Sequence, residues 1–129
     1  MSDAYAVIGN PITHSKSPLI HTVFSKQTKQ DMHYEALFSP LNGFTEAIRL
    51  FQQNDGKGMN VTIPFKSHAY KISTQLTEQA EAAQAVNTLV FNGNEIHGHN
   101  TDGTGLIRDI ITNLGFTITS KRVLLCGAG

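Results

Sequence analysis

The sequence predicts an α/β protein built on an open, mostly parallel sheet that helices flank on both faces, giving three layers. Short apolar runs that end at glycine, asparagine or proline alternate along the chain with longer segments whose apolar residues recur at helical spacing. Because alternating strands and helices form βαβ units, the early strands are expected to be largely parallel. With 129 residues, 40% of them hydrophobic, the chain is long enough to bury one substantial core.

The first half of the chain is predicted to hold three strands and two helices. Residues 5–8 form a short apolar strand, which a Gly-Asn-Pro stretch closes. Ser17 is typical of a helix N-cap because Pro18 follows at the first helical position, and apolar residues at helical spacing extend this helix to about Lys29. The other elements of this half are a strand at 33–38, an amphipathic helix at 41–53 and a strand at 59–63.

The second half adds a hairpin and a longer helix. A short helix at 64–72 and an alanine-rich helix at 78–84 come first. An Asn-Gly-Asn turn then separates apolar residues 86–91 from residues 95–97, which indicates a β-hairpin. A helix with one apolar face runs from Asp102 to about Leu114, and Gly115 is a natural stop for it.

The last predicted element is an apolar strand at 123–126. It runs into a Gly-Ala-Gly sequence in the way that a dinucleotide-binding turn begins. We place a domain boundary after the long helix, in the polar stretch that precedes this strand. Residues 1–115 would then form one domain, and residues 116–129 the beginning of a second.

Charge and cysteine content exclude several classes of partner. Ten Lys and Arg residues balance ten Asp and Glu residues, so no basic excess favours nucleic acid or an anionic membrane surface. A single cysteine allows no internal disulfide and is typical of a reducing compartment. The sequence shows no secretory signal and no apolar run of membrane-spanning length. We therefore expect a cytoplasmic protein whose partner is a small molecule, either as a monomer or as a homodimer.

Polar residues gather where predicted strands end and helices begin, which is where open α/β sheets bind ligands. Ser15 and Ser17 precede a helix whose first N–H groups favour a carboxylate or a phosphate, although a turn residue and a cap are the simpler interpretation of the local pattern. Asn60 and Thr62 project from one face of a strand end, and Lys66 follows where it can reach back over that end. Taken alone, Lys66 is more simply a solvated lysine.

Two further polar positions follow in the second half. Asn87, at the start of an apolar strand, either binds a ligand or satisfies backbone groups of the turn. Asp102 is either a helix N-cap or a carboxylate beside Lys66, and such a pair in a cleft can orient a hydroxyl group and move a proton. His97 and His99 beside Asp102 give only a weak metal signal, because no cysteine or distant ligand pair accompanies them, and no metal site is expected.

Five stretches, taken in order, resemble the signature of a known family. They are GNPITHSKSP from residue 9, NVTIPFK from residue 60, AVNTL from residue 85, GHNTDGTG from residue 98 and GAG from residue 127. Over residues 5–129 the chain resembles the N-terminal, substrate-binding domain of the shikimate dehydrogenases. Thr22 is a small departure, because the family often has asparagine there.

The resemblance implies an activity and assigns roles to individual residues. Members of this family reduce 3-dehydroshikimate reversibly to shikimate with NADP, in the chorismate pathway of aromatic amino acid biosynthesis. Lys66 and Asp102 would form the catalytic pair, in which Lys66 handles the proton and Asp102 orients the same hydroxyl group. Ser15 and Ser17 would hold the substrate carboxylate. The whole implied substrate-binding set is Ser15, Ser17, Asn60, Thr62, Lys66, Asn87, Thr101 and Asp102.

The resemblance also concerns the cofactor. Gly127, Ala128 and Gly129 would open the NADP-binding turn of a second, Rossmann-type domain, which the family carries after this point. The chain thus resembles a fragment, and we expect it to bind substrate but to be inactive alone. Residues that select NADP over NAD would follow Gly129. A quinate/shikimate dehydrogenase that uses NAD, and a non-catalytic module that binds polyhydroxy acids, are therefore the alternatives.

Overall fold

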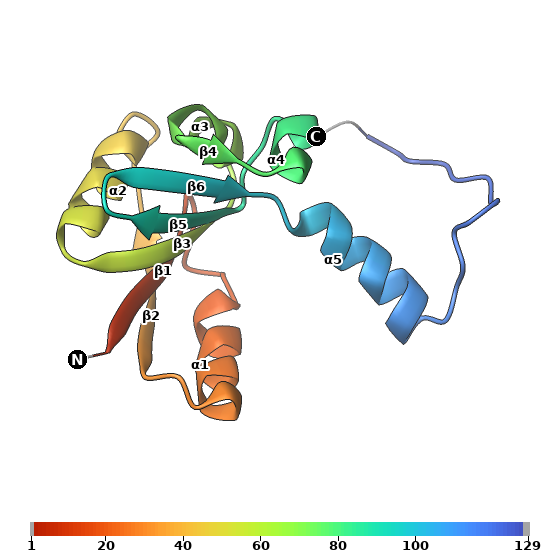
Figure 1. Ribbon diagram of the computed structural model, residues 1–129, viewed down its shortest axis with the longest axis horizontal. Helices are drawn as coiled ribbons and strands as arrows, with labels where there is room; N and C mark the ends of the chain where they lie inside the picture. The colour runs from red at the N-terminus through yellow and green to blue at the C-terminus, as the bar shows by residue number, and fades with distance from the viewer. Residues whose placement is uncertain (1, 128–129) are drawn as a thin grey trace.

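The computed structural model describes residues 2–127, which form a six-stranded sheet with flanking helices (Figure 1). In chain order the strands are β1 (Asp3–Gly9), β2 (Met32–Phe38), β3 (Gly56–Val61), β4 (Gln75–Leu76), β5 (Thr88–Asn92) and β6 (Glu95–His99). The helices are α1 (Ser17–Thr28), α2 (Phe44–Gln53), α3 (Lys66–Ile72), α4 (Glu78–Ala83) and α5 (Asp102–Arg108), followed by the π-helical stretch η1 (Asp109–Asn113).

The sheet has the strand order β2-β1-β3-β5-β6-β4. β1 pairs in parallel with β2 and with β3, as expected for the early strands. β5 then runs antiparallel to both of its neighbours, β3 and β6, and β4 closes the far edge in parallel with β6. This reversal places the start of β5 beside the end of β3, so that Thr88 lies opposite Asn60. The predicted α/β class and the predicted hairpin are therefore confirmed.

Helices lie on both faces of the sheet, which gives the expected three layers. Ala6 and Ile8 of β1, together with Leu89 of β5, belong to the buried core that α2, α3 and α4 share. On the opposite face α1 packs against β1 and β2. There the imidazole ring of His21 stacks on the ring of Tyr34, with ring centroids 4.0 Å apart.

The core fixes the position of α3, and with it the site described below. The rings of Phe44 and Phe65 stack with centroids 4.9 Å apart, and both side chains are fully buried. Burial of each such side chain stabilises the fold by about 1.5–3 kcal/mol. Ala69 and Ala80 are also fully buried, and their small side chains let α3 and α4 approach the sheet closely. Lys66, the first residue of α3, follows Phe65 directly.

The N-cap expected at the start of α1 is wrong by one residue. Lys16 occupies the N-cap position and Ser17 is the first helical residue. The hydroxyl group of Ser15 accepts a hydrogen bond from the backbone N–H of Ser17, at 3.2 Å. Ser15 therefore supplies the oxygen that the sequence pattern ascribed to Ser17.

The final strand expected at 123–126 is also wrong. These residues adopt no regular secondary structure, and none of the strands in the described sheet lies beside them. A strand exists only when a neighbour satisfies its backbone N–H and C=O groups, so an apolar sequence alone is insufficient. Leu124 and Leu125 are accordingly 87% and 81% exposed.

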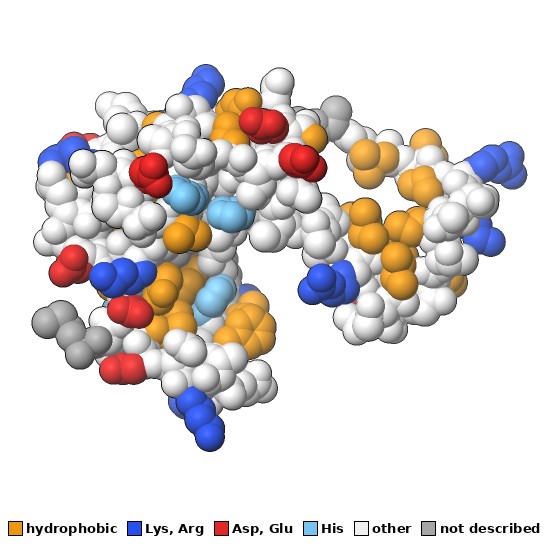
Figure 2. All heavy atoms as spheres, viewed as in Figure 1, with side chains coloured by type: hydrophobic (Ala, Val, Ile, Leu, Met, Phe, Trp, Pro, Cys, Tyr) orange, Lys and Arg blue, Asp and Glu red, His pale blue; other side chains and the backbone are white. Residues whose placement is uncertain are grey.

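The long helix predicted from Asp102 is confirmed, although its last turn is π-helical. It ends before Gly115, whose φ of +71° belongs to the left-handed region that glycine adopts readily. This helix projects away from the sheet (Figure 1), and Figure 2 shows apolar side chains gathered on this part of the molecule. Within residues 2–127, none of the helices combines the length and the hydropathy that a membrane crossing requires.

Candidate active site

A polar cavity of about 240 Å³ lies beyond the end of β3. Its lining comes from β1, β3, the starts of α1, α3 and α5, and the residue before β5. The lining residues are Val7, Ser17, His21, Asn60, Val61, Thr62, Lys66, Asn87 and Asp102. Six of the eight substrate-binding residues that the sequence suggested are therefore brought together, and Ser15 and Thr101 lie in the turns that support them.

Lys66 and Asp102 form an ion pair in this cavity. The Nζ atom of Lys66 lies 2.6 Å from Oδ2 of Asp102, and the two side chains are 33% and 52% exposed. A partly solvated pair of this kind contributes at most about 1 kcal/mol to stability. The pair is therefore more important for placing an ammonium group and a carboxylate together than for holding the fold.

Asn87 fixes the orientation of the Asp102 carboxylate. Its side-chain NH₂ group donates to Oδ1 of Asp102 at 3.0 Å and to the hydroxyl oxygen of Thr101 at 2.8 Å. Its carbonyl oxygen accepts from the backbone N–H of Thr101 at 3.0 Å. Asp102 is the first helical residue of α5 and Thr101 is the N-cap, so the interpretation of Asp102 as a cap is wrong. Its carboxylate is instead shared between Asn87 and Lys66.

Ser17 belongs to the cavity, whereas Ser15 supports it from the loop. His21 lies one helical turn after Ser17 and also lines the cavity. Because a carbonyl oxygen only accepts hydrogen bonds, Nδ1 of His21 donates to the backbone oxygen of Ser17, at 2.9 Å. Sequence reasoning missed His21, although its spacing from Ser17 on the same helix was a usable signal.

Tyr34 is a second residue that sequence reasoning missed. Its hydroxyl group donates to Oδ1 of Asn60 at 2.7 Å. Burial raises the pKa of Tyr34 to about 12, and a hydrogen bond with the Ser17 side chain opposes this shift in part. Only the parallel pairing of β2 with β1 brings Tyr34 to this place, so no local sequence signal indicates it.

Thr62 reaches the cavity because Gly9 has no side chain. The N–H of Thr62 donates to the backbone oxygen of Ile8 at 3.0 Å, which places Thr62 directly against the end of β1. A Cβ atom at Gly9 would lie 2.6 Å from the Thr62 methyl carbon, well inside the van der Waals distance. The glycine of the GNPITHSKSP stretch is therefore a requirement of packing at the site.

The described residues do not form a cofactor site by themselves. Gly127 has a φ of +100°, as the predicted glycine-dependent turn requires, and nothing lies within 4 Å of a Cβ atom placed there. Ala128 and Gly129 lie outside the described residues. A dinucleotide pyrophosphate binds at a helix N-terminus after such a turn, and residues 114–127 contain no helix.

His97 and His99, whose spacing gave a weak metal signal in the sequence, have different surroundings in the structure. Nε2 of His97 lies 2.9 Å from a carboxylate oxygen of Glu95, and His99 lines a separate cavity near α5. Among residues 2–127, no three His, Cys, Asp or Glu side chains gather in a way that would hold a metal ion.

Comparison with known proteins identifies relatives of the chain. The model of the shikimate dehydrogenase substrate binding domain matches residues 7–89. The shikimate dehydrogenase (NADP(+)) of Nitrosospira multiformis is 59% identical over 129 residues, which are 100% of this chain and 47% of that protein. The protein of the same name from Dechloromonas aromatica is 58% identical with the same coverage. The chain thus spans about half the length of the curated relatives it matches.

A solved structure shows the same arrangement of elements. Shikimate 5-dehydrogenase from Listeria monocytogenes, crystallised in complex with shikimate and NAD, superposes with a TM-score of 0.90 at 32% sequence identity. The match covers 99% of this chain and 44% of that one. The α/β arrangement described above is therefore shared with a dehydrogenase over nearly the whole chain.

Proposed function

The chain belongs to the family of shikimate dehydrogenase substrate-binding domains, and from this premise we propose that it forms the substrate-binding half of an NADP-dependent shikimate dehydrogenase. The observation that carries the proposal is the Lys66–Asp102 pair in a polar cavity, at 2.6 Å. The reaction is the reversible reduction of 3-dehydroshikimate to shikimate, in the chorismate pathway of aromatic amino acid biosynthesis. We place it in the cytoplasm, since a single cysteine suits a reducing compartment.

The cavity offers groups of the kinds that a polyhydroxy acid needs. Amide and hydroxyl groups of Asn60, Thr62 and Asn87 can exchange hydrogen bonds with ring hydroxyl groups. Ser17 lies at the start of α1, where free backbone N–H groups would also face an anion bound in the cavity. We assign the carboxylate of the substrate to this end of the cavity, with Ser15 holding the loop.

Lys66 and Asp102 would handle the reacting hydroxyl group. An ammonium group beside the carbonyl oxygen of 3-dehydroshikimate donates a proton to that oxygen as it becomes a hydroxyl, and takes the proton back in the reverse direction. Asp102 accepts a hydrogen bond from the same hydroxyl group and so orients it. The nicotinamide cofactor supplies the redox chemistry. The cofactor site requires more than the described residues. We therefore propose that this chain alone binds substrate without turnover. We also propose that the cofactor domain begins near residue 116.

Two other functions compete with this proposal. A quinate/shikimate dehydrogenase that uses NAD would present the same cavity, because the residues that select the cofactor would follow Gly129. A module that binds a polyhydroxy acid without any reaction would also use Asn60 and Thr62. It would have no need for the Lys66–Asp102 pair, which is why we place the dehydrogenase first.

The test is a titration of shikimate into the 129-residue chain, followed by amide chemical shifts. Saturable shifts should gather at Ser17, Asn60, Lys66, Asn87 and Asp102. The Asn60→Leu variant should lose them, whereas Lys71→Ala, which removes an exposed lysine elsewhere on α3, should keep them. A folded chain that shows no shifts would contradict the proposed site.

A parallel titration and an activity assay separate the alternatives. Quinate should shift the same resonances with lower affinity, and equal affinity would favour the quinate/shikimate alternative. In a protein that carries this sequence at the full length of its relatives, shikimate should be oxidised with NADP. Binding without any oxidation would favour the non-catalytic module.

A further inference from the structure

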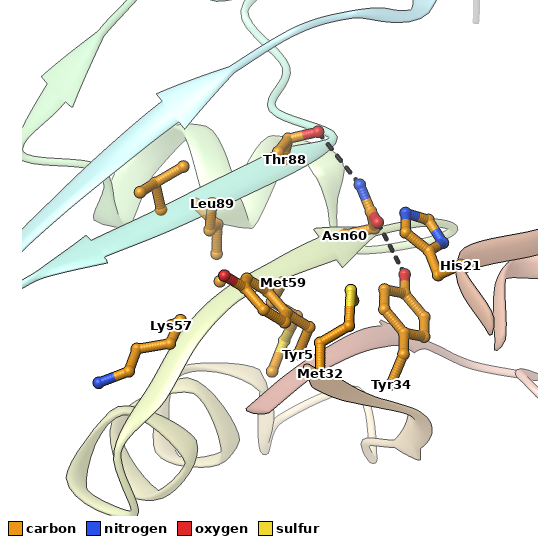
Figure 3. A pocket seen from close by; sticks show the side chains of 11 residues that line it. Tyr5, His21, Met32, Tyr34, Lys57, Met59, Asn60, Thr88 and Leu89 are labelled. Carbon is orange, nitrogen blue, oxygen red and sulfur yellow. Dashed lines mark hydrogen bonds between the residues drawn. The ribbon is translucent and has the colours of Figure 1, made fainter. Parts of the chain in front are cut away.

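Two cavities meet at a wall made by Asn60. The polar cavity lies on one side, and an apolar cavity of about 380 Å³ lies on the other, over β1, β2, β3 and β5. Asn60 and His21 line both cavities, whereas Tyr34 and Thr88 line only the apolar one. Figure 3 shows Tyr34 and Thr88 on opposite sides of the Asn60 amide, each joined to it by a hydrogen bond.

A continuous series of hydrogen bonds runs from this wall to the ion pair. Nδ2 of Asn60 donates to the hydroxyl oxygen of Thr88 at 3.2 Å. That hydroxyl group donates to Oδ1 of Asn87 at 3.0 Å. Nδ2 of Asn87 donates to Oδ1 of Asp102 at 3.0 Å, and Oδ2 of Asp102 accepts from Lys66.

The number of protons on each group decides which group donates and which accepts in each hydrogen bond of this series. The Thr88 hydroxyl group has one proton, which it gives to the Asn87 carbonyl, so towards Asn60 it can only accept. The NH₂ end of Asn60 must therefore face Thr88, and its carbonyl end faces the hydroxyl group of Tyr34. In the same way the carbonyl of Asn87 faces Thr88 and its NH₂ end faces Asp102. The Thr88 hydroxyl group thus links the two amides. The ends of Asn87 are also distinguished by the Thr101 N–H and the Asp102 carboxylate, and the NH₂ end of Asn60 by the backbone oxygen of Asn87.

The backbone holds Thr88 firmly in this role. Thr88 is the first residue of β5, an interior strand, and it pairs with Asn60 of β3 on one side and with His99 of β6 on the other. Its β-branched side chain has few accessible rotamers. The hydroxyl group is therefore placed by two strand ladders. The backbone of Asn87, just before the strand, is held on the same two sides by hydrogen bonds with Val61 at 2.8 Å and His99 at 3.0 Å.

We infer that Thr88 is a positioning residue of this site: its hydroxyl group links the Asn60 and Asn87 amides in one hydrogen-bond series and, through Asn87, helps to hold the Asp102 carboxylate against Lys66. The inference rests on the proposed function in so far as it concerns turnover. Thr88 does not line the polar cavity, so its effect reaches the substrate only through these neighbours. Tyr34 begins the same series of hydrogen bonds, because its hydroxyl group donates to Oδ1 of Asn60.

The first test measures amide orientation in the chain itself and does not depend on shikimate. Thr88→Val keeps the shape of the side chain and removes the hydroxyl group, and Thr88→Ser keeps the hydroxyl group. The side-chain NH₂ resonances of Asn60 and Asn87 should shift and broaden in Thr88→Val and stay close to wild type in Thr88→Ser. Thr74→Val is the control, because that hydroxyl group bonds only the backbone of Ile96. Unchanged NH₂ resonances in Thr88→Val would overturn the inference.

The second test uses the full-length enzyme. Thr88→Val should lower kcat by on the order of 100-fold, the effect of a misplacement near 1 Å, with a smaller change in KM, and Thr88→Ser should restore most of the rate. In a Lys66→Ala background the same substitution should change kcat only slightly. Fully additive losses, or no recovery with serine, would overturn the inference. If the wild-type enzyme does not oxidise shikimate, the proposed function fails, and the NH₂ resonances still decide the role of Thr88.

Discussion

The Nζ atom of Lys66 lies 2.6 Å from Oδ2 of Asp102, although 36 residues separate them in the sequence. Lys66 is the first residue of α3 and Asp102 is the first residue of α5. The N-terminus of a helix carries a partial positive charge, which favours a carboxylate and disfavours an ammonium group. The carboxylate of Asp102 is thus in a favourable electrostatic position at the start of α5. Its negative charge also offsets the unfavourable position of the Lys66 ammonium group at the start of α3.

Replacement of Lys66 tests whether this pair acts in the chemical step. In a full-length enzyme, Lys66→Ala should lower kcat by about 10²–10⁴-fold, the usual contribution of a positioned acid or base, and should change KM much less. Steady-state kinetics with shikimate as the varied substrate gives both values. Lys71→Ala on the same helix should behave like wild type. If substrate binding weakened as much as turnover, Lys66 would be a binding residue and not a proton donor.

Gly9 should not tolerate a side chain, because the Thr62 methyl carbon occupies the space. Gly9→Ala should lower the free energy of unfolding by about 1–3 kcal/mol, which is typical of an overpacked site. It should also weaken shikimate binding, since Thr62 is displaced. Urea unfolding and the shikimate titration measure the two effects.

A second substitution shows whether Thr62 is the cause. Thr62→Ser removes the crowded methyl group, so the double variant Gly9→Ala/Thr62→Ser should recover part of the lost stability. Gly105→Ala is the matched control, because nothing lies within 4 Å of its Cβ position. Equal losses of stability in the single and double variants would exclude the Thr62 contact as the source.

Tyr34 should make the stability of the fold depend on alkaline pH. The folded state raises the pKa of Tyr34 to about 12, whereas an unfolded tyrosine titrates near pH 10. The folded state therefore retains a proton that the unfolded state releases in this interval. The stabilisation that the protonated Tyr34 contributes to the folded state is fully present below about pH 10. It is lost as the pH rises to about 12. Urea unfolding between pH 9 and 12 should show a steeper loss of stability for wild type than for Tyr34→Phe. Parallel curves for the two proteins would contradict the expectation.

Much of the fold was predictable because it rests on local patterns. The helical spacing before Lys29 and the Asn-Gly-Asn turn each indicate one structure, and both predictions are confirmed. β4 was missed, because a strand of two residues, Gln75–Leu76, has no detectable period. The strand expected at 123–126 failed for a different reason, since a strand depends on a partner that local sequence does not specify.

The sequence indicated which polar residues lie near the cavity, but it did not indicate the hydrogen bonds that link them. Six of the predicted polar residues at element ends line one cavity and Lys66 does meet Asp102, whereas their binding and catalytic roles stay predictions. The N-cap expected at Ser17 lies one residue earlier, and Ser15 supports the loop. Tyr34 and Thr88 could not be found in the same way, because strand pairing places them beside Asn60 and neither carries a local functional signal.

The reversed direction of β5 also separates the site from the hairpin turn. β5 begins beside the polar cavity and runs away from it, and β6 returns, so the turn at Gly93 lies at the opposite end of both strands. Gly93 has nothing within 4 Å of its Cβ position and adopts a φ of +57°. A fluorophore or a peptide tag attached at this turn would therefore sit a full strand length from the cavity. We therefore expect that immobilisation through this turn would leave the cavity open to its ligand.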